Sequence, residues 1–284
     1  MIKTKFGSIV SHKFNNQYIC YDSSIQPILK DRILASLDSD EFRLSNTSNF
    51  LDLNNGLIKK HFYRKGAMHL FNDNYFYYGL KNTRPIREQK NYMDFMNIVK
   101  NSKNEWVTSK LELCMPIFSY VIRSNLFYKG DIILSKITGE TLDKTLMKRL
   151  KINIEEEVGL CFRFLFDNGI YNFDMNLTNI IYNPESDKLS FIDFDKVTIN
   201  SRKINSQNYS ARVINKFSDS LKKYDLFSKF DWDKFVKPNK LREIAKQNSL
   251  KFNKLDGVKL DLFLNKWKLS KDSSVNYISN FIKT

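Results

Sequence analysis

The sequence predicts an α+β protein with two lobes, a small β-rich N-terminal lobe and a mainly helical C-terminal lobe. Three observations support this fold class. Residues 57–63 alternate in the manner of a strand, and a stretch that suits a helix follows from Pro85. Residues 171–181 form a polar loop that leads into a short hairpin. The second half of the chain also carries two stretches in which apolar residues recur at helical spacing.

The strand at residues 57–63 contains two neighbouring lysines. Alternation of side chains puts Ile58 and Lys60 on one face, so Lys60 is the better candidate for a lysine that points inward. A slip of one residue in the register would select Lys59 instead. The alternative is an ordinary solvated lysine pair on an edge strand.

A helix and a further strand complete the N-terminal lobe, for which we expect residues 1–135. Pro85 suits the first turn of a helix over residues 83–93, and Glu88 lies on that helix. Residues 131–139 predict a strand that runs into a turn. The hinge between the two lobes is expected at this turn.

The C-terminal lobe, expected over residues 136–239, contains two amphipathic helices. The apolar stripe of the first consists of Val158, Cys161, Phe162 and Leu165. Asn168 and Gly169 supply its stop. The apolar stripe of the second consists of Val213, Ile214, Phe217 and Leu221. The other side of this second helix is either simply solvated or rests on anionic lipid head groups. That side carries Arg212, Lys216, Lys222 and Lys223.

The hairpin between these helices is expected to pair residues 180–182 with residues 189–192 through a turn at 183–187. Beyond these two lobes, residues 240–284 are expected to form a C-terminal extension. Its apolar residues predict one more amphipathic helix, which packs on the C-terminal lobe or rests on a membrane. These residues are Leu260, Phe263, Leu264 and Trp267.

Asp174, Asn179 and Asp193 stand in the order and spacing of a phosphoryl-transfer centre. This chemistry needs a carboxylate to orient and deprotonate the acceptor hydroxyl, and hard oxygen ligands to hold Mg²⁺ on the phosphates of ATP. Protein kinases use the same layout, an Asp, an Asn five positions later, and a second Asp after a short hairpin. We predict Asp174 as the base and Asn179 and Asp193 as metal ligands. Alternatively, Asp174 and Asn179 only cap or turn the chain.

The same layout suggests roles for four residues nearer the N-terminus. Lys60 would contact the nucleotide phosphates, and Glu88 would form an ion pair with it. Backbone groups near Ser135 and Ile137 would bind the adenine edge. A surface ion pair at helical spacing is the ordinary alternative for Glu88.

The amino-acid composition limits the kinds of binding partner that we expect. The formal net charge of +15 indicates an anionic partner, which could be nucleic acid, an anionic lipid surface or a charged substrate. The aromatic run at residues 75–78 would suit nucleic acid, but no recognised nucleic-acid module is present, so nucleic acid is not expected. No export signal is expected, because no apolar region follows the charged N-terminal residues. No membrane span is expected, because no apolar run approaches about 20 residues. The three cysteines lack the spacing of a zinc site or a disulfide framework.

Several short segments carry a wider similarity, and they lie at residues 18–22, 60–66, 78–84, 87–88, 137–139, 167–176 and 192–196. With these segments the chain resembles the bacterial 3-deoxy-D-manno-octulosonic acid (Kdo) kinases, in the lipopolysaccharide-kinase branch of the protein-kinase-like fold. The resemblance runs from about Tyr18 to about Trp232. Asp195, where ordinary protein kinases have Gly, belongs to the pattern of this family.

The resemblance implies a bilobal protein-kinase-like fold and transfer of the ATP γ-phosphate to a Kdo sugar of a Kdo-lipid A precursor, with the 4-hydroxyl as the expected acceptor. It implies peripheral attachment to the anionic cytoplasmic face of the inner membrane. Candidates for holding the acidic groups of the acceptor are Arg64, Lys65, Arg84 and Arg87. Kinase activity on another acceptor, such as a core heptose or a protein, and a non-catalytic kinase-like binding protein are the alternatives.

Two features depart from the family pattern. Asn172 stands where the family normally has the His of the catalytic-loop motif. The segment expected to cover the phosphates, residues 45–50, contains no glycine, which makes close approach of the backbone to phosphate harder.

Overall fold

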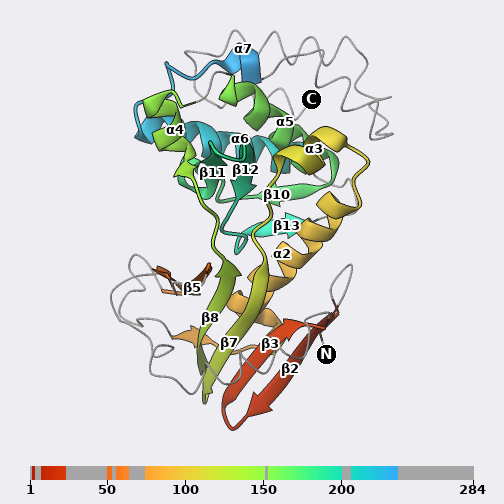
Figure 1. Ribbon diagram of the computed structural model, residues 1–284. Coiled ribbons are helices and arrows are strands. Elements are labelled where there is room, and N and C mark those ends of the chain that lie inside the picture. The colour runs from red at the N-terminus through yellow and green to blue at the C-terminus, as the bar shows by residue number, and fades with distance from the viewer. Residues whose placement is uncertain are drawn as a thin grey trace. The chain divides into compact units, whose positions relative to one another are not determined.

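The computed structural model describes residues 2–3, 8–23, 50–52, 56–63, 74–150, 153–199 and 206–235. The chain divides into two compact units, and each is described by itself (Figure 1). The first consists of residues 1–97 and 114–136, and the second of residues 98–113 and 137–284. The predicted segments 1–135, 136–239 and 240–284 stay a prediction. The C-terminal extension and residues 45–49 lie outside the described residues.

The first unit is built on an eight-stranded sheet of antiparallel pairs (Figure 1). Its order is β1-β2-β3-β7-β8-β5-β4, and β6 pairs with β8. The strands are β1 (Ile2–Lys3), β2 (Ser8–Phe14), β3 (Gln17–Asp22), β4 (Phe50–Asp52), β5 (Leu57–His61), β6 (Tyr75–Phe76), β7 (Pro116–Ser124) and β8 (Phe127–Ser135). The predicted lysine-bearing strand is therefore confirmed as β5, between β4 and β8.

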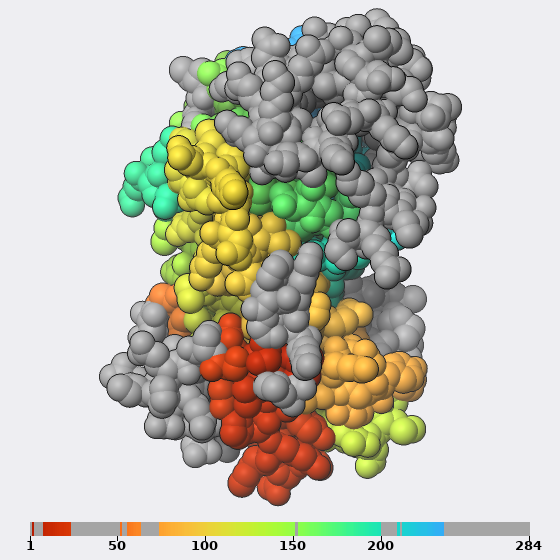
Figure 2. All heavy atoms as spheres, turned by 90° about the vertical axis from the view of Figure 1, so that its right-hand side faces the viewer, coloured from red at the N-terminus to blue at the C-terminus, as the bar shows by residue number. Residues whose placement is uncertain are grey.

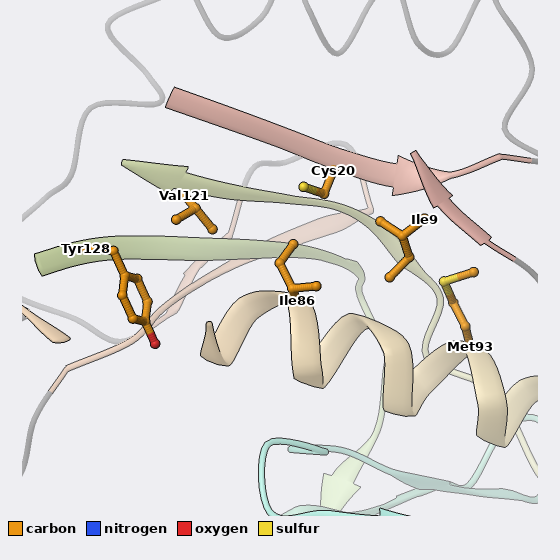
Figure 3. Packing of buried hydrophobic residues seen from close by; sticks show 6 residues of the cluster. All are labelled: Ile9, Cys20, Ile86, Met93, Val121 and Tyr128. Carbon is orange, nitrogen blue, oxygen red and sulfur yellow. The ribbon is translucent and has the colours of Figure 1, made fainter. Parts of the chain in front are cut away.

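Helix α2 (Arg84–Lys100) packs on this sheet and follows the short 3-10 helix η3 (Leu80–Asn82). Ile86 and Met93 point from α2 toward the strands (Figure 3). There they join a buried cluster with Ile9, Cys20, Val121 and Tyr128. Gly130 on β8 allows this approach, since a Cβ atom there would lie 2.6 Å from Cγ of Pro85 in the first turn of α2.

The second unit contains both predicted amphipathic helices. Its helices are α3 (Glu105–Lys110), α4 (Leu142–Lys148), α5 (Ile154–Asp167), α6 (Ser206–Lys223) and α7 (Trp232–Phe235). All eight residues of the two predicted apolar stripes, on α5 and α6, are buried. Helix α5 ends at the predicted stop, with Asn168 as its C-cap and Gly169 at φ +69°. Periodicity therefore located both buried faces.

Two small sheets in the second unit frame the polar loop. Their strands are β9 (Glu140–Thr141), β10 (Ile170–Asn172), β11 (Ile180–Asn183), β12 (Lys188–Phe191) and β13 (Val197–Ile199). The 3-10 helix η4 (Leu177–Asn179) leads into β11. The predicted hairpin is confirmed as β11–β12, with Ile180 opposite Phe191. A sheet-rich unit and a helical unit thus confirm the α+β class.

No helix in the described ranges is long and apolar enough to cross a membrane.

Candidate active site

The loop between β10 and β11 holds Asp174 through three asparagines. The backbone N–H of Asp174 donates to Oδ1 of Asn172 at 2.9 Å, and Nδ2 of Asn179 donates to the carbonyl oxygen of Asp174 at 2.9 Å. Nδ2 of Asn176 donates to both the carbonyl oxygen and the carboxylate of Asp174, at 3.0 and 3.2 Å. Asp174 is therefore fixed on both its backbone and its side chain.

Asn172 also connects this loop to the segment that carries Asp193. Its Nδ2 donates to the carbonyl oxygen of Asp193 at 3.2 Å, while its Oδ1 accepts from Asp174. The side chain is buried, with 3% of the residue exposed. One amide thus joins the predicted base to the predicted metal ligand, so Asn172, at the position where the resemblance led us to expect a His, links the two acidic segments.

Asn179 and Asp193 are joined by their neighbours. The N–H of Ile192 donates to the carbonyl oxygen of Asn179 at 2.9 Å. Asp193 has φ +62°, in the left-handed region that Asp and Asn tolerate better than most residues. A strained backbone of this kind often occurs at functional sites.

These two residues supply oxygen donors that suit Mg²⁺. The amide nitrogen of Asn179 is engaged with Asp174, so its amide oxygen is the atom that could ligate a cation, beside the carboxylate of Asp193. Mg²⁺ in nucleotide sites is usually held by one or two protein ligands together with phosphates. Within the described residues, no group of three or more His, Cys, Asp and Glu side chains gathers into a protein-only metal cage.

Two lysines contact the Asp174 carboxylate. Nζ of Lys196 donates to Oδ2 at 3.0 Å, and Nζ of Lys216 lies 3.7 Å from Oδ1. Partial burial alone would raise the pKa of Asp174, but Lys196, Asn176 and Lys216 outweigh it and lower this pKa below its ordinary value. Asp174 is therefore held as a carboxylate.

Two features of the fold place Lys196 and Lys216 beside Asp174. Strands β10 and β13 pair with Asn172 opposite Val197, and the N–H of Phe173 then donates to the carbonyl oxygen of Lys196 at 3.2 Å. Helix α6 is anchored because Oγ of Ser220 accepts from the N–H of Leu177 at 3.1 Å.

Lys216 lies one helical turn before Ser220, so it faces the same loop. Arg212 lies a further turn before, with its guanidinium 4.4 Å from the centroid of the Phe173 ring. From the sequence, Arg212 and Lys216 could be placed only on the basic side of a helix, and their position beside the loop of Asp174 was not predicted. Arg212, Lys216 and Ser220 follow one another at a spacing of four residues, which places them on one face of a helix. This spacing is the signal that could have identified them as a group.

In the first unit, Lys60 and Glu88 form the expected ion pair. Nζ of Lys60 donates to the two carboxylate oxygens of Glu88 at 2.9 and 2.8 Å. Glu88 is fully buried, and Lys60 is 7% exposed. The same ammonium group lies 5.2 Å from the centroid of the Phe62 ring. The structure thus gives the Glu88 partner to Lys60, as the chosen strand register required.

The two expected adenine-binding residues end up in different units, Ser135 in the first and Ile137 in the second. The N–H of Ser135 donates to the carbonyl oxygen of Met115 at 2.8 Å. The N–H of Lys136 donates to the carbonyl oxygen of Gly56, also at 2.8 Å. The carbonyl oxygen of Ser135 in turn accepts from Sγ of Cys114 at 3.4 Å, so both backbone groups of Ser135 have partners within the first unit.

Arg84, a candidate for holding the acceptor, has a structural explanation. Its guanidinium lies 5.0 Å from the Phe62 ring centroid and 5.1 Å from that of Tyr75, and it donates to the Tyr75 hydroxyl. Arg87 is exposed on α2. Arg64 and Lys65 lie outside the described residues.

Comparison with known families gives one extended match. The profile of the family described as "Lipopolysaccharide kinase (Kdo/WaaP) family" matches residues 36–238, which is more than half of the chain. This range includes Lys60 and Glu88, and also the predicted base Asp174 with the predicted metal ligands Asn179 and Asp193.

Among curated proteins, the ubiquinone biosynthesis O-methyltransferase of Pelagibacter ubique (strain HTCC1062) is 53% identical over 53 residues, 19% of this chain and 22% of that protein. The chain thus spans about a fifth of the length of this curated relative, and the match is too short to assign a methyltransferase.

Solved structures with some likeness include WaaP in complex with acyl carrier protein, at 10% identity and a TM-score of 0.40, over 80% of this chain and 90% of that chain. The bifunctional kinase-methyltransferase WbdD matches at 14% identity and a TM-score of 0.33, over 75% of this chain and 46% of that chain. Likenesses of this size carry no argument about function.

Proposed function

Because the chain belongs to the lipopolysaccharide kinase (Kdo/WaaP) family, we propose that it is an ATP-dependent phosphotransferase of lipopolysaccharide core biosynthesis. The acceptor that we propose is a Kdo sugar on a Kdo-lipid A precursor, with its 4-hydroxyl as the expected site. The observation that carries the proposal is the network in which Asn172 links Asp174 to Asp193 and Asn179 holds the Asp174 backbone.

In the proposed reaction, Asp174 accepts the proton of the acceptor hydroxyl as that oxygen attacks the γ-phosphorus of ATP in line with the leaving oxygen. The lowered pKa of Asp174 keeps it ionised and able to orient the hydroxyl. A modest base suffices, because the transition state of phosphoryl transfer is loose and little proton transfer is needed to reach it.

Lys60 is proposed to bind the phosphates of ATP. Glu88 fixes the position of its ammonium group, and the low exposure of both side chains strengthens their attraction. Asn179 and Asp193 would hold Mg²⁺. When bound, this ion supplies positive charge to the nucleotide phosphates.

We also propose that the protein works at the cytoplasmic face of the inner membrane as a peripheral protein. Support comes from one end of the first unit, where the turns of the β2–β3 and β7–β8 hairpins and strand β6 meet (Figure 2). Four apolar side chains there are 45 to 76% exposed, and we call them the hairpin-tip surface. They are Phe14, Phe76, Tyr78 and Leu126.

Hydrogen bonds join the two hairpin turns and the β6 segment at this end of the first unit. The N–H of Arg123 donates to the carbonyl oxygen of Asn16, and the N–H of Tyr77 to that of Leu126, both at 2.8 Å. The three segments, residues 13–18, 75–82 and 122–129, carry four basic residues and contain no acidic residue. Exposed aromatic and aliphatic groups flanked by cations are typical of surfaces that bind anionic lipid.

The test of the function is direct phosphorylation. Purified protein is incubated with ATP, Mg²⁺ and a Kdo-bearing lipid A precursor, in parallel with precursor that lacks Kdo. Mass spectrometry should find one added phosphate on the Kdo-bearing lipid alone. Phosphate on neither lipid, with ATP binding intact, would point to another acceptor such as a heptose or a protein. Absence of ATP binding would point to a non-catalytic binding protein.

A further inference from the structure

In the second unit two lysines contact the proposed base, and an arginine lies against the residue before it. Lys196 and Lys216 contact the two oxygens of the Asp174 carboxylate, at 3.0 and 3.7 Å. Arg212 stacks on Phe173, the residue before Asp174, at 4.4 Å. Positive charge near the proposed acceptor site therefore comes from two separate elements. Lys196 lies in the loop after Asp193, and Lys216 and Arg212 lie on one side of α6.

Both lysines reach the Asp174 carboxylate from solvent-exposed positions. The side chains of Lys196 and Lys216 are 58% and 43% exposed. Ion pairs with this exposure contribute little to stability, because water and salt screen them. Such pairs are easily exchanged for a charge-assisted bond to an incoming anionic ligand.

We propose that Arg212, Lys216 and Lys196 form a binding site for an anionic group of the acceptor, namely the carboxylate of the Kdo sugar whose hydroxyl group is phosphorylated. This inference rests on the proposed function. In the free protein Asp174 occupies the two lysines. When the acceptor binds, its carboxylate takes over these cations, and the Asp174 carboxylate becomes free to accept from the hydroxyl.

The γ-phosphate of ATP is the other anion that could use these cations. Arg212 favours the acceptor, because it lies against the Phe173 ring and, within the described residues, forms no ion pair with the proposed metal ligand Asp193. Of the proposed metal ligands, Asn179 lies on the C-terminal side of Asp174 and donates to its carbonyl oxygen, whereas Asp193 is linked to the N-terminal side through Asn172. The nucleotide phosphates are expected with the metal ligands.

Helix α6 offers a matched control for the test. Lys222 lies on the same helix, and its side chain is 44% exposed compared with 43% for Lys216. It is 3.9 Å from Asp219 rather than from Asp174. Lys216→Met and Lys222→Met therefore remove the same charge at similar exposure, and they differ in whether that charge faces the proposed base.

The experiment measures KM for Kdo-lipid A precursor and for ATP, with wild type and both variants. A second acceptor has its sugar carboxylate converted to the neutral amide. Loss of one charge-assisted contact should raise KM of Lys216→Met for the natural acceptor about tenfold, with KM for ATP changed less than about twofold. Lys222→Met should match wild type. With the amide acceptor, wild type and Lys216→Met should no longer differ.

A folding defect is excluded if Lys216→Arg restores the acceptor KM and the melting temperatures agree. An acceptor KM of Lys216→Met equal to that of Lys222→Met would overturn the site, and a rise confined to KM for ATP would assign the cations to the nucleotide. In both cases wild type still phosphorylates the Kdo lipid and the proposed function stands. Absence of phosphorylation by wild type would instead refute that function, and this inference with it.

Discussion

At the scale of single residues, Asn172 joins the two acidic segments of the proposed catalytic centre. Its amide serves as acceptor for the Asp174 N–H and as donor to the Asp193 carbonyl oxygen. An amide can play both parts at once because it carries both an N–H₂ and a C=O group. The substitution at this position of the family motif is therefore compatible with the geometry that the chemistry needs.

Replacement of Asn172 by Ala should both destabilise the protein and impair the centre. It leaves partly buried backbone groups of Asp174 and Asp193 without two hydrogen bonds, which costs about 1–3 kcal/mol in the free energy of unfolding. Chemical denaturation measures this loss, and a kinase assay should show a lower kcat. Unchanged stability and kcat would mean that the bridge is not needed.

The change Asp174→Asn should abolish turnover and leave ATP affinity and the melting temperature nearly unchanged. The amide cannot accept the hydroxyl proton, although it keeps the shape of the side chain. Calorimetric titration with ATP and the phosphorylation assay together check this. Asp219→Asn, at an exposed position on α6, is the control. Turnover retained by Asp174→Asn would remove Asp174 from its proposed role.

At the scale of elements, the Lys60–Glu88 pair joins strand β5 to helix α2 inside the first unit. The core around Ile86 and Met93 packs α2 on the sheet and so presents Glu88 to β5 (Figure 3). Buried ion pairs are poor sources of stability, because desolvation offsets their attraction. A pair retained in such a place is better explained by the position that it gives to the lysine.

Single and double variants separate these two roles. Glu88→Gln or Lys60→Met should each lower the free energy of unfolding by about 3–5 kcal/mol, because a buried charge loses its partner. The double variant Lys60→Met with Glu88→Leu should recover part of that stability. Its ATP affinity should stay low, since the phosphate-binding lysine is gone. Stability is measured in urea and affinity by calorimetry. Normal ATP affinity of the double variant would contradict the role of Lys60.

At the scale of the whole molecule, the net charge of +15 and the hairpin-tip surface favour the same kind of partner. The charge draws the protein to an anionic surface from a distance within the Debye length, and the exposed apolar side chains strengthen contact once it is reached. The lipid substrate of the proposed reaction lies in such a surface.

Sedimentation with vesicles tests this attachment. The protein should sediment with vesicles that contain anionic phospholipid and less with neutral vesicles, and added salt should weaken binding. Phe14→Ser combined with Leu126→Ser should reduce binding, while Met147→Ser, at an exposed position in the second unit, should not. Equal binding by all three proteins would exclude the hairpin-tip surface as the contact.

Local features of both the fold and the site could be read from the sequence. The β11–β12 hairpin, the stop at Asn168 and the buried faces of α5 and α6 were all predicted, because each depends on neighbours a few residues away. The role of backbone groups was less accessible. The N–H of Ser135 donates to the carbonyl oxygen of Met115, a bond that depends on how the end of β8 lies beside the residue before β7.

By itself the sequence determined which residue types are present for phosphoryl transfer and in what order, because this chemistry demands an Asp, an Asn and an Asp at short spacing. Only the tertiary structure decided which distant groups surround them. Lys216 reaches Asp174 because Ser220 anchors α6 on η4, and Lys60 reaches Glu88 because α2 packs on the sheet. Such contacts arise from burial and packing between elements, which periodicity within one element does not encode.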